Sequence, residues 1–220
     1  MVHFKDYPDF TPNLTPQQIF SLGSFGGTYW RPIFSKVNKK SYKHQHKEFS
    51  WLRKLPKQKI SSVLCEPKIN NYKVSVGTSL KFWESKGWIN SIDPYGWVQW
   101  YCRFYDGRRS DDDARQIKRW LRLAGPKGRF RKWLISLIQK KKGYWNDHDI
   151  SPKIRQTLQH WGYRLTKKDF ETELTNRKQK NISTQSKRTQ SKRTQSKRTQ
   201  SKRTQSKRTQ SKRKKSKSKD

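Results

Sequence analysis

The chain has 220 residues, a length that suits one or two small domains, and its 53 Lys and Arg against 16 Asp and Glu give a net charge of +37. No apolar run approaches the ~20 residues that a membrane helix needs, and residues 1–6 lack the apolar segment of a secretory signal. Two cysteines, Cys65 and Cys102, cannot form a disulfide scaffold or a four-cysteine zinc site. We therefore expect an intracellular protein without a transmembrane segment and with a polyanionic partner, DNA or RNA first and an anionic membrane second.

Apolar residues and charge are distributed differently along the chain. Residues 177–220 contain one apolar side chain, Ile182, whereas all 11 glycines lie in residues 1–176. The tail has 19 basic residues and one acid, +18, so the body has 53 − 19 = 34 basic residues and 16 − 1 = 15 acids, +19. We predict that residues 1–176 form a single folded body with one core and that residues 177–220 form a disordered basic tail.

The first part of the body, residues 1–92, is predicted to be irregular and rich in aromatic residues, with little β-structure. Thr15, Pro16 and Gln18 have the pattern of a capping box at the start of a helix. Gly23 is the natural end of that helix, which is therefore short.

Three further patterns follow in this part. The Gly-Gly turn at residues 26–27 is expected to place Tyr29 and Trp30 in the core. Residues 72–76 alternate between polar and apolar side chains, which predicts a short strand. Thr78 then caps a second short helix.

The second part, residues 93–176, is predicted to contain four or five short helices, so the fold class is mainly α. Asp93 caps its first helix, whose aromatic residues recur at i, i+3, i+4 and i+7 and form one buried stripe. The stripe consists of Trp97, Trp100, Tyr101 and Phe104. Eight of the ten tryptophans lie between Trp83 and Trp161, and each aromatic side chain buries ~150–250 Å², so we expect a compact Trp-rich core.

The later helices are placed by their caps and by apolar periodicity. Ser110 opens a helix with acids at residues 111–113, and the Gly-Pro-Lys-Gly sequence at residues 125–128 ends it. Its predicted buried face consists of Ala114, Ile117, Leu121 and Ala124. The next two helices are marked by Phe130, Leu134, Leu137 and Ile138, and by Ile154, Leu158 and Trp161. Residues 166–169 begin a last short helix.

Few residues suggest catalysis or metal binding. Residues 111–113 are adjacent carboxylates, but successive helical residues point about 100° apart, so cap and dipole roles are favoured over a Mg²⁺ site. The His-x-His pair at residues 44–46 is favoured as surface histidines. Cys102 is favoured as a half-buried structural residue, with His148 and His160 as candidate bases by proximity alone. We predict no cofactor and no metal, and enzymatic activity stays open because no catalytic motif occurs.

The sharper signal is a set of basic residues on two consecutive helices. Arg115, Lys118, Arg119 and Arg122 lie on the outer face of the first, and Arg129, Arg131 and Lys132 lie at the start of the second. Two interpretations stay open: a helix-turn-helix whose second helix contacts bases, or a helical hairpin with a solvated basic face. Most aromatic side chains are expected in the core, and exposed ones would stack on single-stranded bases.

The tail is a repeat. Six copies of Thr-Gln-Ser-Lys-Arg run from Thr184 to Arg213, and a period of five matches neither a helix nor a strand. Its basic residues are candidate phosphate ligands, represented by Lys187, Arg188, Lys192 and Arg193. A solubility tail and a nuclear localisation signal are the other interpretations. Phosphorylation of its Ser and Thr residues would cancel the +18 and release nucleic acid.

A series of motifs within residues 8–170 resembles a family of uncharacterised proteins of eukaryotes and large DNA viruses. The motifs are Trp83-Glu84, Gly87-Trp88-Ile89, Asp93-Pro94, Gly96-Trp97, Gln99-Trp100-Tyr101-Cys102-Arg103-Phe104-Tyr105, Gly107-Arg108-Arg109, Asp112-Asp113, Arg115-Gln116-Ile117, Arg155-Gln156 and His160-Trp161-Gly162-Tyr163. The resemblance implies a folded unit to which a tail is added, and it implies no activity and no catalytic residue. A viral origin would favour packaging or association with the virion.

These features predict a nucleic-acid-associated protein that binds largely without sequence preference, through a basic body surface and a polycationic tail. One alternative is an enzyme acting on nucleic acid or nucleotides, which needs a converging cluster of acid, His or Cys side chains. The other is a structural or virion component. We expect the protein in the nucleus, or in a viral factory or virion if the chain is viral. The preferred nucleic acid and the oligomeric state stay open.

Overall fold

The computed structural model describes residues 2–186, so the predicted disorder of the later repeats, with Lys187, Arg188, Lys192 and Arg193, lies outside the described residues. The chain divides into two compact units, residues 1–170 and residues 171–220. The predicted boundary lies somewhat later, after residue 176.

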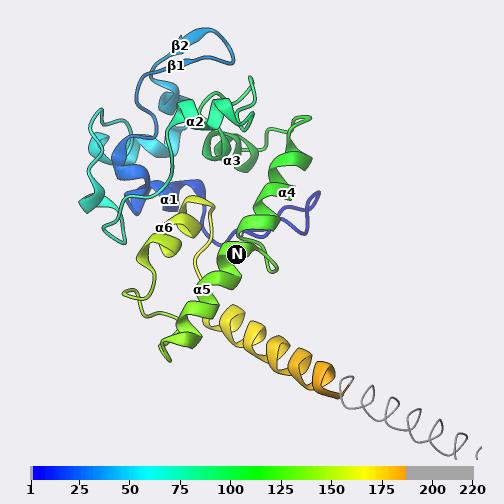
Figure 1. Ribbon diagram of the computed structural model, residues 1–220. Helices are drawn as coiled ribbons and strands as arrows, with labels where there is room; N and C mark the ends of the chain where they lie inside the picture. The colour runs from blue at the N-terminus through cyan, green and yellow to red at the C-terminus, as the bar shows by residue number, and fades with distance from the viewer. Residues whose placement is uncertain (1, 187–220) are drawn as a thin grey trace, which may run out of the picture. The chain divides into compact units, whose positions relative to one another are not determined.

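The described part of the chain is mainly helical, as predicted (Figure 1). Its α-helices are α1 (Pro16–Ser21), α2 (Leu80–Ser85), α3 (Trp97–Tyr105), α4 (Asp113–Leu123), α5 (Arg129–Lys140) and α6 (Pro152–His160). Its 3-10 helices are η1 (Ser24–Gly27), η2 (Gln45–Glu48), η3 (Ser50–Lys54), η4 (Lys57–Lys59) and η5 (Pro67–Ile69). All the 3-10 turns precede α2, which confirms an irregular first part followed by a helical second part.

The described residues contain one short β-hairpin. β1 (Ile33–Ser35) pairs antiparallel with β2 (Lys40–Tyr42), and Phe34 lies opposite Ser41. The hairpin is tied to α2, because the amide of Lys36 donates to the carboxylate of Glu84 at 2.7 Å.

The strand predicted at residues 72–76 is wrong, because nearby backbone groups bind side chains in place of a partner strand. The side-chain Nδ2 of Asn70 donates to the carbonyl of Val74 at 2.6 Å. The amide of Tyr72 donates to the side-chain Oε1 of Gln156 at 3.3 Å. An alternating pattern identifies a strand only when another strand is there to accept these bonds.

Two predictions about the start of the chain are confirmed. The capping box of α1 is formed, since the Thr15 hydroxyl accepts a bond from the Gln18 amide at 3.2 Å and the Gln18 side chain accepts one from the Thr15 amide at 2.8 Å. Residues 25–27 all have left-handed φ angles of 57° to 79°. This tight turn brings Tyr29 and Trp30 into the core, where both are buried.

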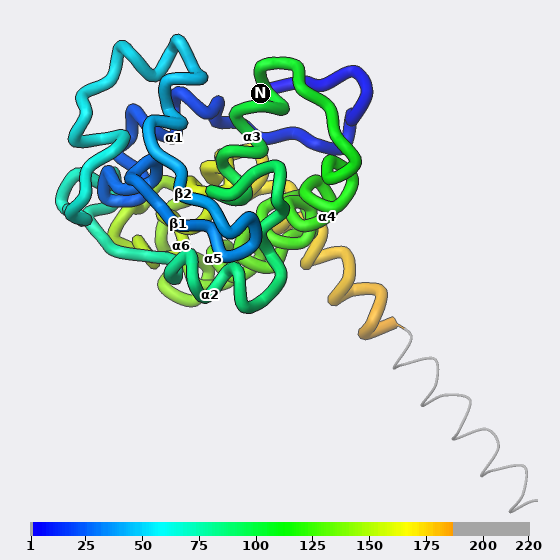
Figure 2. Tube along the Cα trace, turned by 90° about the horizontal axis from the view of Figure 1, so that it is seen from above, coloured from blue at the N-terminus to red at the C-terminus, as the bar shows by residue number. Residues whose placement is uncertain are grey.

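The core is built on the predicted aromatic stripe of α3, whose four side chains are all buried. Phe10 is fully buried and packs against five aromatic rings of α3 and α4, with centroid distances of 5.2 to 6.0 Å. These rings belong to Trp97, Trp100, Tyr101, Phe104 and Trp120. The N-terminal segment therefore closes the core over both helices, and Figure 2 shows it beside them.

A set of hydrogen bonds joins the two ends of the first unit. The amides of Asn13 and Leu14 both donate to the carbonyl of Gly162 at 3.0 Å. The Asn13 side chain donates to the Arg164 carbonyl at 2.7 Å and accepts from the Arg164 amide at 2.8 Å. We call these four bonds the Asn13 clasp, and its side-chain bonds join residues 151 positions apart.

The buried face of α4 is rotated from the predicted one. Ile117 and Ala124 are buried as predicted, but Ala114 is exposed and Leu121 is half-buried. The buried residues of the helix are Asp113, Gln116, Ile117 and Trp120. Two of these four are polar, and a face defined by apolar residues alone misses them.

The carboxylates at the start of α4 have structural partners. Asp113 accepts bonds from the indole Nε1 of Trp100 at 2.8 Å and from the amide and hydroxyl of Ser110, both at 2.9 Å. Ser110 is therefore a donor to Asp113, and its predicted role as the N-cap is wrong. The N-cap is Asp112, which makes no side-chain cap bond.

Two other predicted caps, those of α2 and α3, are also displaced. α2 is capped by Ser79, while the predicted Thr78 accepts a bond from the Trp83 indole at 2.6 Å. α3 starts after Gly96, and the predicted Asp93 binds elsewhere. Asp93 is fully buried, and its carboxylate pairs with Arg103 at 2.9 Å and with Arg108 at 2.6 Å.

The remaining helices follow their apolar periodicity. Of the predicted residues of α5 and α6, the buried ones are Leu134, Ile138, Ile154 and Leu158, and the half-buried ones are Phe130, Leu137 and Trp161. Residues 167–170 are helical at the end of the first unit, and residues 171–186 are helical in the second. The predicted last helix is thus longer than expected and includes residues 177–186 of the predicted tail. In the part of the chain that the structure describes, we find no helix with the length and apolarity to cross a membrane.

Candidate nucleic-acid interface

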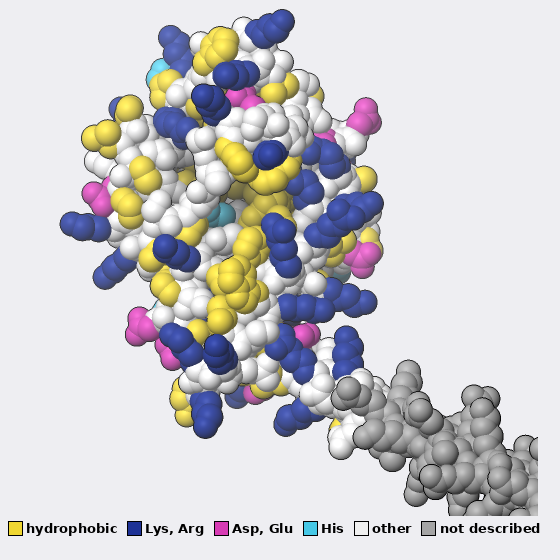
Figure 3. Space-filling model, viewed as in Figure 1, with side chains coloured by type: hydrophobic (Ala, Val, Ile, Leu, Met, Phe, Trp, Pro, Cys, Tyr) yellow, Lys and Arg dark blue, Asp and Glu magenta, His cyan; other side chains and the backbone are white. Residues whose placement is uncertain are grey.

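The outer face of α4 carries the first group of predicted phosphate ligands. Lys118 and Arg122 are exposed. Arg115 is half-buried and pairs with the buried carboxylate of Asp112, with Nη2 at 2.8 Å from Oδ2. Figure 3 shows a band of apolar side chains down one face of the first unit, with Lys and Arg side chains on both sides of it. Such a face offers contacts to both bases and phosphates.

Arg119 lies between two tryptophans. Its guanidinium carbon is 5.7 Å from the ring centroid of Trp88 and 5.5 Å from that of Trp161. Its Nη1 also donates to the side chain of Gln116 at 3.0 Å. Burial and the neighbouring charge of Arg115 lower the pKa of Arg119 to about 10, so the side chain stays charged at neutral pH. A cation over indole rings stabilises both the cation and the ring positions.

The stack continues outward from Trp88. The Phe82 ring meets Trp88 edge to face at 5.8 Å, and the Lys86 ammonium lies 5.6 Å from the Phe82 centroid. We name Lys86, Phe82, Trp88, Arg119 and Trp161 the aromatic–cation ladder. Phe82 is 39% exposed and Trp88 is 41% exposed. The inner end is fixed, because Trp161 stacks on Trp97 of the core at 4.7 Å.

The predicted residues at the start of α5 differ in accessibility. Arg129 is exposed and Lys132 is half-buried. Arg131 is buried, pairs with Asp169 at 2.5 Å, and lies 4.8 Å from the ring centroid of Tyr163. Arg131 therefore supports the core, and the prediction that it binds nucleic acid is corrected. Trp133 of the same helix is 54% exposed.

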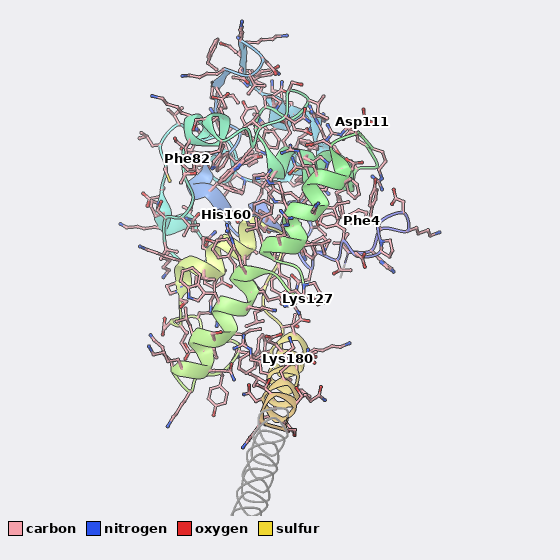
Figure 4. All side chains as sticks on the ribbon, turned by 45° about the vertical axis from the view of Figure 1, so that its right-hand side comes forward. Phe4, Phe82, Asp111, Lys127, His160 and Lys180 are labelled. Carbon is pink, nitrogen blue, oxygen red and sulfur yellow. The ribbon has the colours of Figure 1, made fainter. Side chains whose placement is uncertain are left out.

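α4 and α5 form neither a helix-turn-helix nor a helical hairpin. Figures 1 and 4 show α5 continuing from the end of α4 in the same general direction. The connection is tight, because a Cβ added at Gly128 would lie 2.6 Å from the carbonyl of Leu123. The second helix therefore does not cross the first as a recognition helix does in a helix-turn-helix.

The predicted reactive residues form no cluster. Cys102 is fully buried rather than half-buried, and burial raises the pKa of its thiol. His44 is exposed and His46 is half-buried, with their ring centroids 6.2 Å apart, and His148 is exposed. Across residues 2–186, no group of three or more His, Cys, Asp or Glu side chains is placed to hold a metal ion.

Unlike His44, His46 and His148, His160 is buried, with 8% of its surface exposed. Its ring stacks on Phe25 with centroids 4.0 Å apart, and its Nε2 accepts bonds from the Phe25 amide at 3.4 Å and from the Gln156 side chain at 3.0 Å. Because both partners donate to Nε2, the ring proton is on Nδ1. Burial lowers the pKa of His160 to about 3, so the ring is neutral at pH 7.

This shift predicts a pH dependence of stability. The unfolded chain binds the His160 proton with a pKa of about 6.5, whereas the folded chain binds it only near 3. Between these values the unfolded state holds more protons, so the free energy of unfolding rises with pH by up to about 1.4 kcal/mol per pH unit. Urea denaturation across this range should show a steeper rise for the natural chain than for His160→Gln. Equal slopes would contradict the buried neutral ring.

Sequence reasoning found Arg119 but missed its partners. The alternation of basic and aromatic residues over residues 81–88 is the signal that was available for Phe82, Lys86 and Trp88. Trp161 was assigned to the face of a helix and lies half-buried just past the end of α6.

Comparisons of the chain with protein-family models, curated proteins and solved structures find no match. The resemblance to uncharacterised proteins of eukaryotes and large DNA viruses therefore stays a prediction.

Proposed function

We propose that the chain binds nucleic acid, largely without sequence preference, through the aromatic–cation ladder, the basic face of α4 and the polycationic tail. The observation that carries the proposal is Arg119 between Trp88 and Trp161, beside the exposed Lys118 and Arg122. Exposed ring faces next to fixed cations are typical of surfaces that bind unpaired strands. The polybasic tail also supports a nuclear location.

The ladder favours single strands over duplexes. The rings of Phe82 and Trp88 can stack only on bases that are not already stacked in a helix. Lys118 and Arg122 would neutralise phosphates of the same strand, which releases condensed counterions. Stacking selects single strands, whereas the charges add affinity for any nucleic acid.

Replacing Trp88 with alanine tests the stacking role. We expect affinity for a single-stranded oligonucleotide to fall by about 1–3 kcal/mol, the contribution of one base–aromatic stack, while duplex affinity changes little. Fluorescence anisotropy with labelled oligonucleotides measures both. Tyr144→Ala is the matched control, because Tyr144 is a 78% exposed aromatic residue that is not part of the ladder. Equal losses for both strand types would leave Trp88 with no stacking role.

Removing Lys118 and Arg122 together tests the basic face of α4. Each phosphate contact contributes about 0.7–0.9 to the slope of log K against log salt, so the double alanine variant should lose about 1.5. The control is Arg53→Ala with Lys54→Ala, which removes the same charge from exposed positions on η3, away from α4 in Figures 1 and 2. If both double variants lower the salt slope equally, the protein attracts nucleic acid through its net charge alone and not through a specific face of α4.

A further inference from the structure

The first unit contains a pocket of about 350 Å³ that the ladder does not use. This volume lies in the ~300–1,000 Å³ range of small-molecule sites. The pocket's lining residues Trp83 and His160 are chain neighbours of the ladder residues Phe82 and Trp161.

Four aromatic side chains line the pocket, among aliphatic and polar ones. The rings are those of Phe25, Tyr29, Trp83 and Tyr95. The Tyr29 hydroxyl donates to the Tyr95 carbonyl at 2.7 Å, and the Tyr95 hydroxyl donates to the Arg31 carbonyl at 2.8 Å. Since these hydroxyl protons are used, the tyrosines offer a ligand their rings, and flat apolar rings suit a flat ligand.

His160 also lines the pocket. Its Nε2 binds Phe25 and Gln156, so the ring proton is on Nδ1. The side chain, labelled in Figure 4, is 8% exposed. Phe25 holds the ring by both stacking and its amide, and it does so with a left-handed φ of 68°. Such left-handed non-glycine residues cluster at binding sites.

Arg31 supplies a positive charge to the same pocket. Its Nη1 donates to the Thr28 carbonyl at 3.0 Å. A guanidinium has five N–H donors, so others are available to an anionic group. Arginine forks bind phosphate well.

We propose that this pocket binds a nucleobase, held against its aromatic side chains, with an acceptor atom of the base on the His160 Nδ1–H and the sugar-phosphate towards Arg31. The proposal rests on the proposed function and deepens it, since one unstacked base of a bound strand would enter the pocket. A free nucleotide and a base within a strand are two sources of the same chemistry.

Cys65 provides a direct test, because it lines the pocket and is exposed while Cys102 is fully buried. A thiol reagent should therefore modify Cys65 in the folded full-length protein. The rate is measured at high salt with adenosine, guanosine, cytidine or uridine, which carry no charge and are not attracted by the net charge. We expect at least one nucleoside to slow the reaction about tenfold near 90% occupancy. Ribose is the base-free control.

Two variants make the result specific to the pocket. Ser75 lines the pocket and is exposed, so Ser75→Trp should fill it and abolish nucleoside protection. Asn71→Trp adds the same bulk at an exposed position that is not part of the pocket lining. This variant should retain nucleoside protection. Protection is compared with the nucleoside-free rate of each variant. Far-ultraviolet circular dichroism verifies that both are folded.

Two further ligands separate the sources of the base. A single-stranded oligonucleotide that protects Cys65 when polyphosphate does not would identify a base of a strand. Protection by nucleosides alone would identify a free nucleotide. If no nucleoside protects, or if ribose or polyphosphate protects equally well, base recognition is overturned. Oligonucleotide binding that persists in that case would leave the ladder proposal standing.

Discussion

Replacing Phe10 with alanine is expected to lower the free energy of unfolding by about 3–5 kcal/mol. Phe10 is fully buried against rings of α3 and α4. Truncating its side chain therefore leaves a cavity, because the two helices cannot move together to fill the space. A typical domain is stable by only ~5–15 kcal/mol, and the variant should therefore unfold at much lower urea concentration. Tryptophan fluorescence reports the transition.

The control for this variant is Phe34→Ala. Phe34 is 59% exposed on β1, so its truncation should change stability by no more than about 0.5 kcal/mol. Similar losses for the two variants would mean that the N-terminal segment does not complete the core. If Phe10→Ala lowers the free energy of unfolding as expected but leaves the oligonucleotide affinity of the folded protein unchanged, the role of Phe10 is in stability and not in binding.

Removing residues 177–220 is expected to have the largest effect on binding. The deletion takes away 19 of the 53 basic residues, and each phosphate contact adds about 0.7–0.9 to the slope of log K against log salt. A slope that falls by several units corresponds to an affinity loss of roughly 10³-fold or more at low salt. Salt titrations of full-length and truncated protein measure both quantities.

A tail with Gln at every Lys and Arg position is the matched control, because it keeps the length and removes the charge. It should behave like the deletion. An unchanged slope in either variant would exclude the tail from binding. The preference for single strands should survive in both, since we assign it to the ladder and not to the tail.

The elements that were predicted correctly from the sequence are those in which a single local pattern determines the structure. The stripe of α3 has only large apolar side chains at helical spacing, and the capping box of α1 is complete within four residues. α4 departs from the rule because Asp113 and Gln116 are buried on its face, paid for by hydrogen bonds to residues outside the helix or at its start. The periodicity of apolar residues does not describe such polar partners, whether they lie in another helix, as Trp100 does, or at the start of the same one, as Asp112 does.

The same reason limits prediction of the interface. Arg119 and Arg131 look alike in the sequence, as arginines on amphipathic helices. The structure places Arg119 between Trp88 and Trp161, which are distant in the chain, and buries Arg131 on Asp169. The exposure and the partners of an arginine depend on how distant segments of the chain pack together. The spacing of basic residues therefore identified the helices but did not distinguish Arg119 from Arg131.

The Asn13 clasp has a consequence for how the chain is made. Residue 13 leaves the ribosome early, but its hydrogen-bond partners at Gly162 and Arg164 are translated near the end of the first unit. The aromatic N-terminal segment must therefore wait, unpaired, while the rest of the core is synthesised, and contacts of such high sequence separation make folding slow.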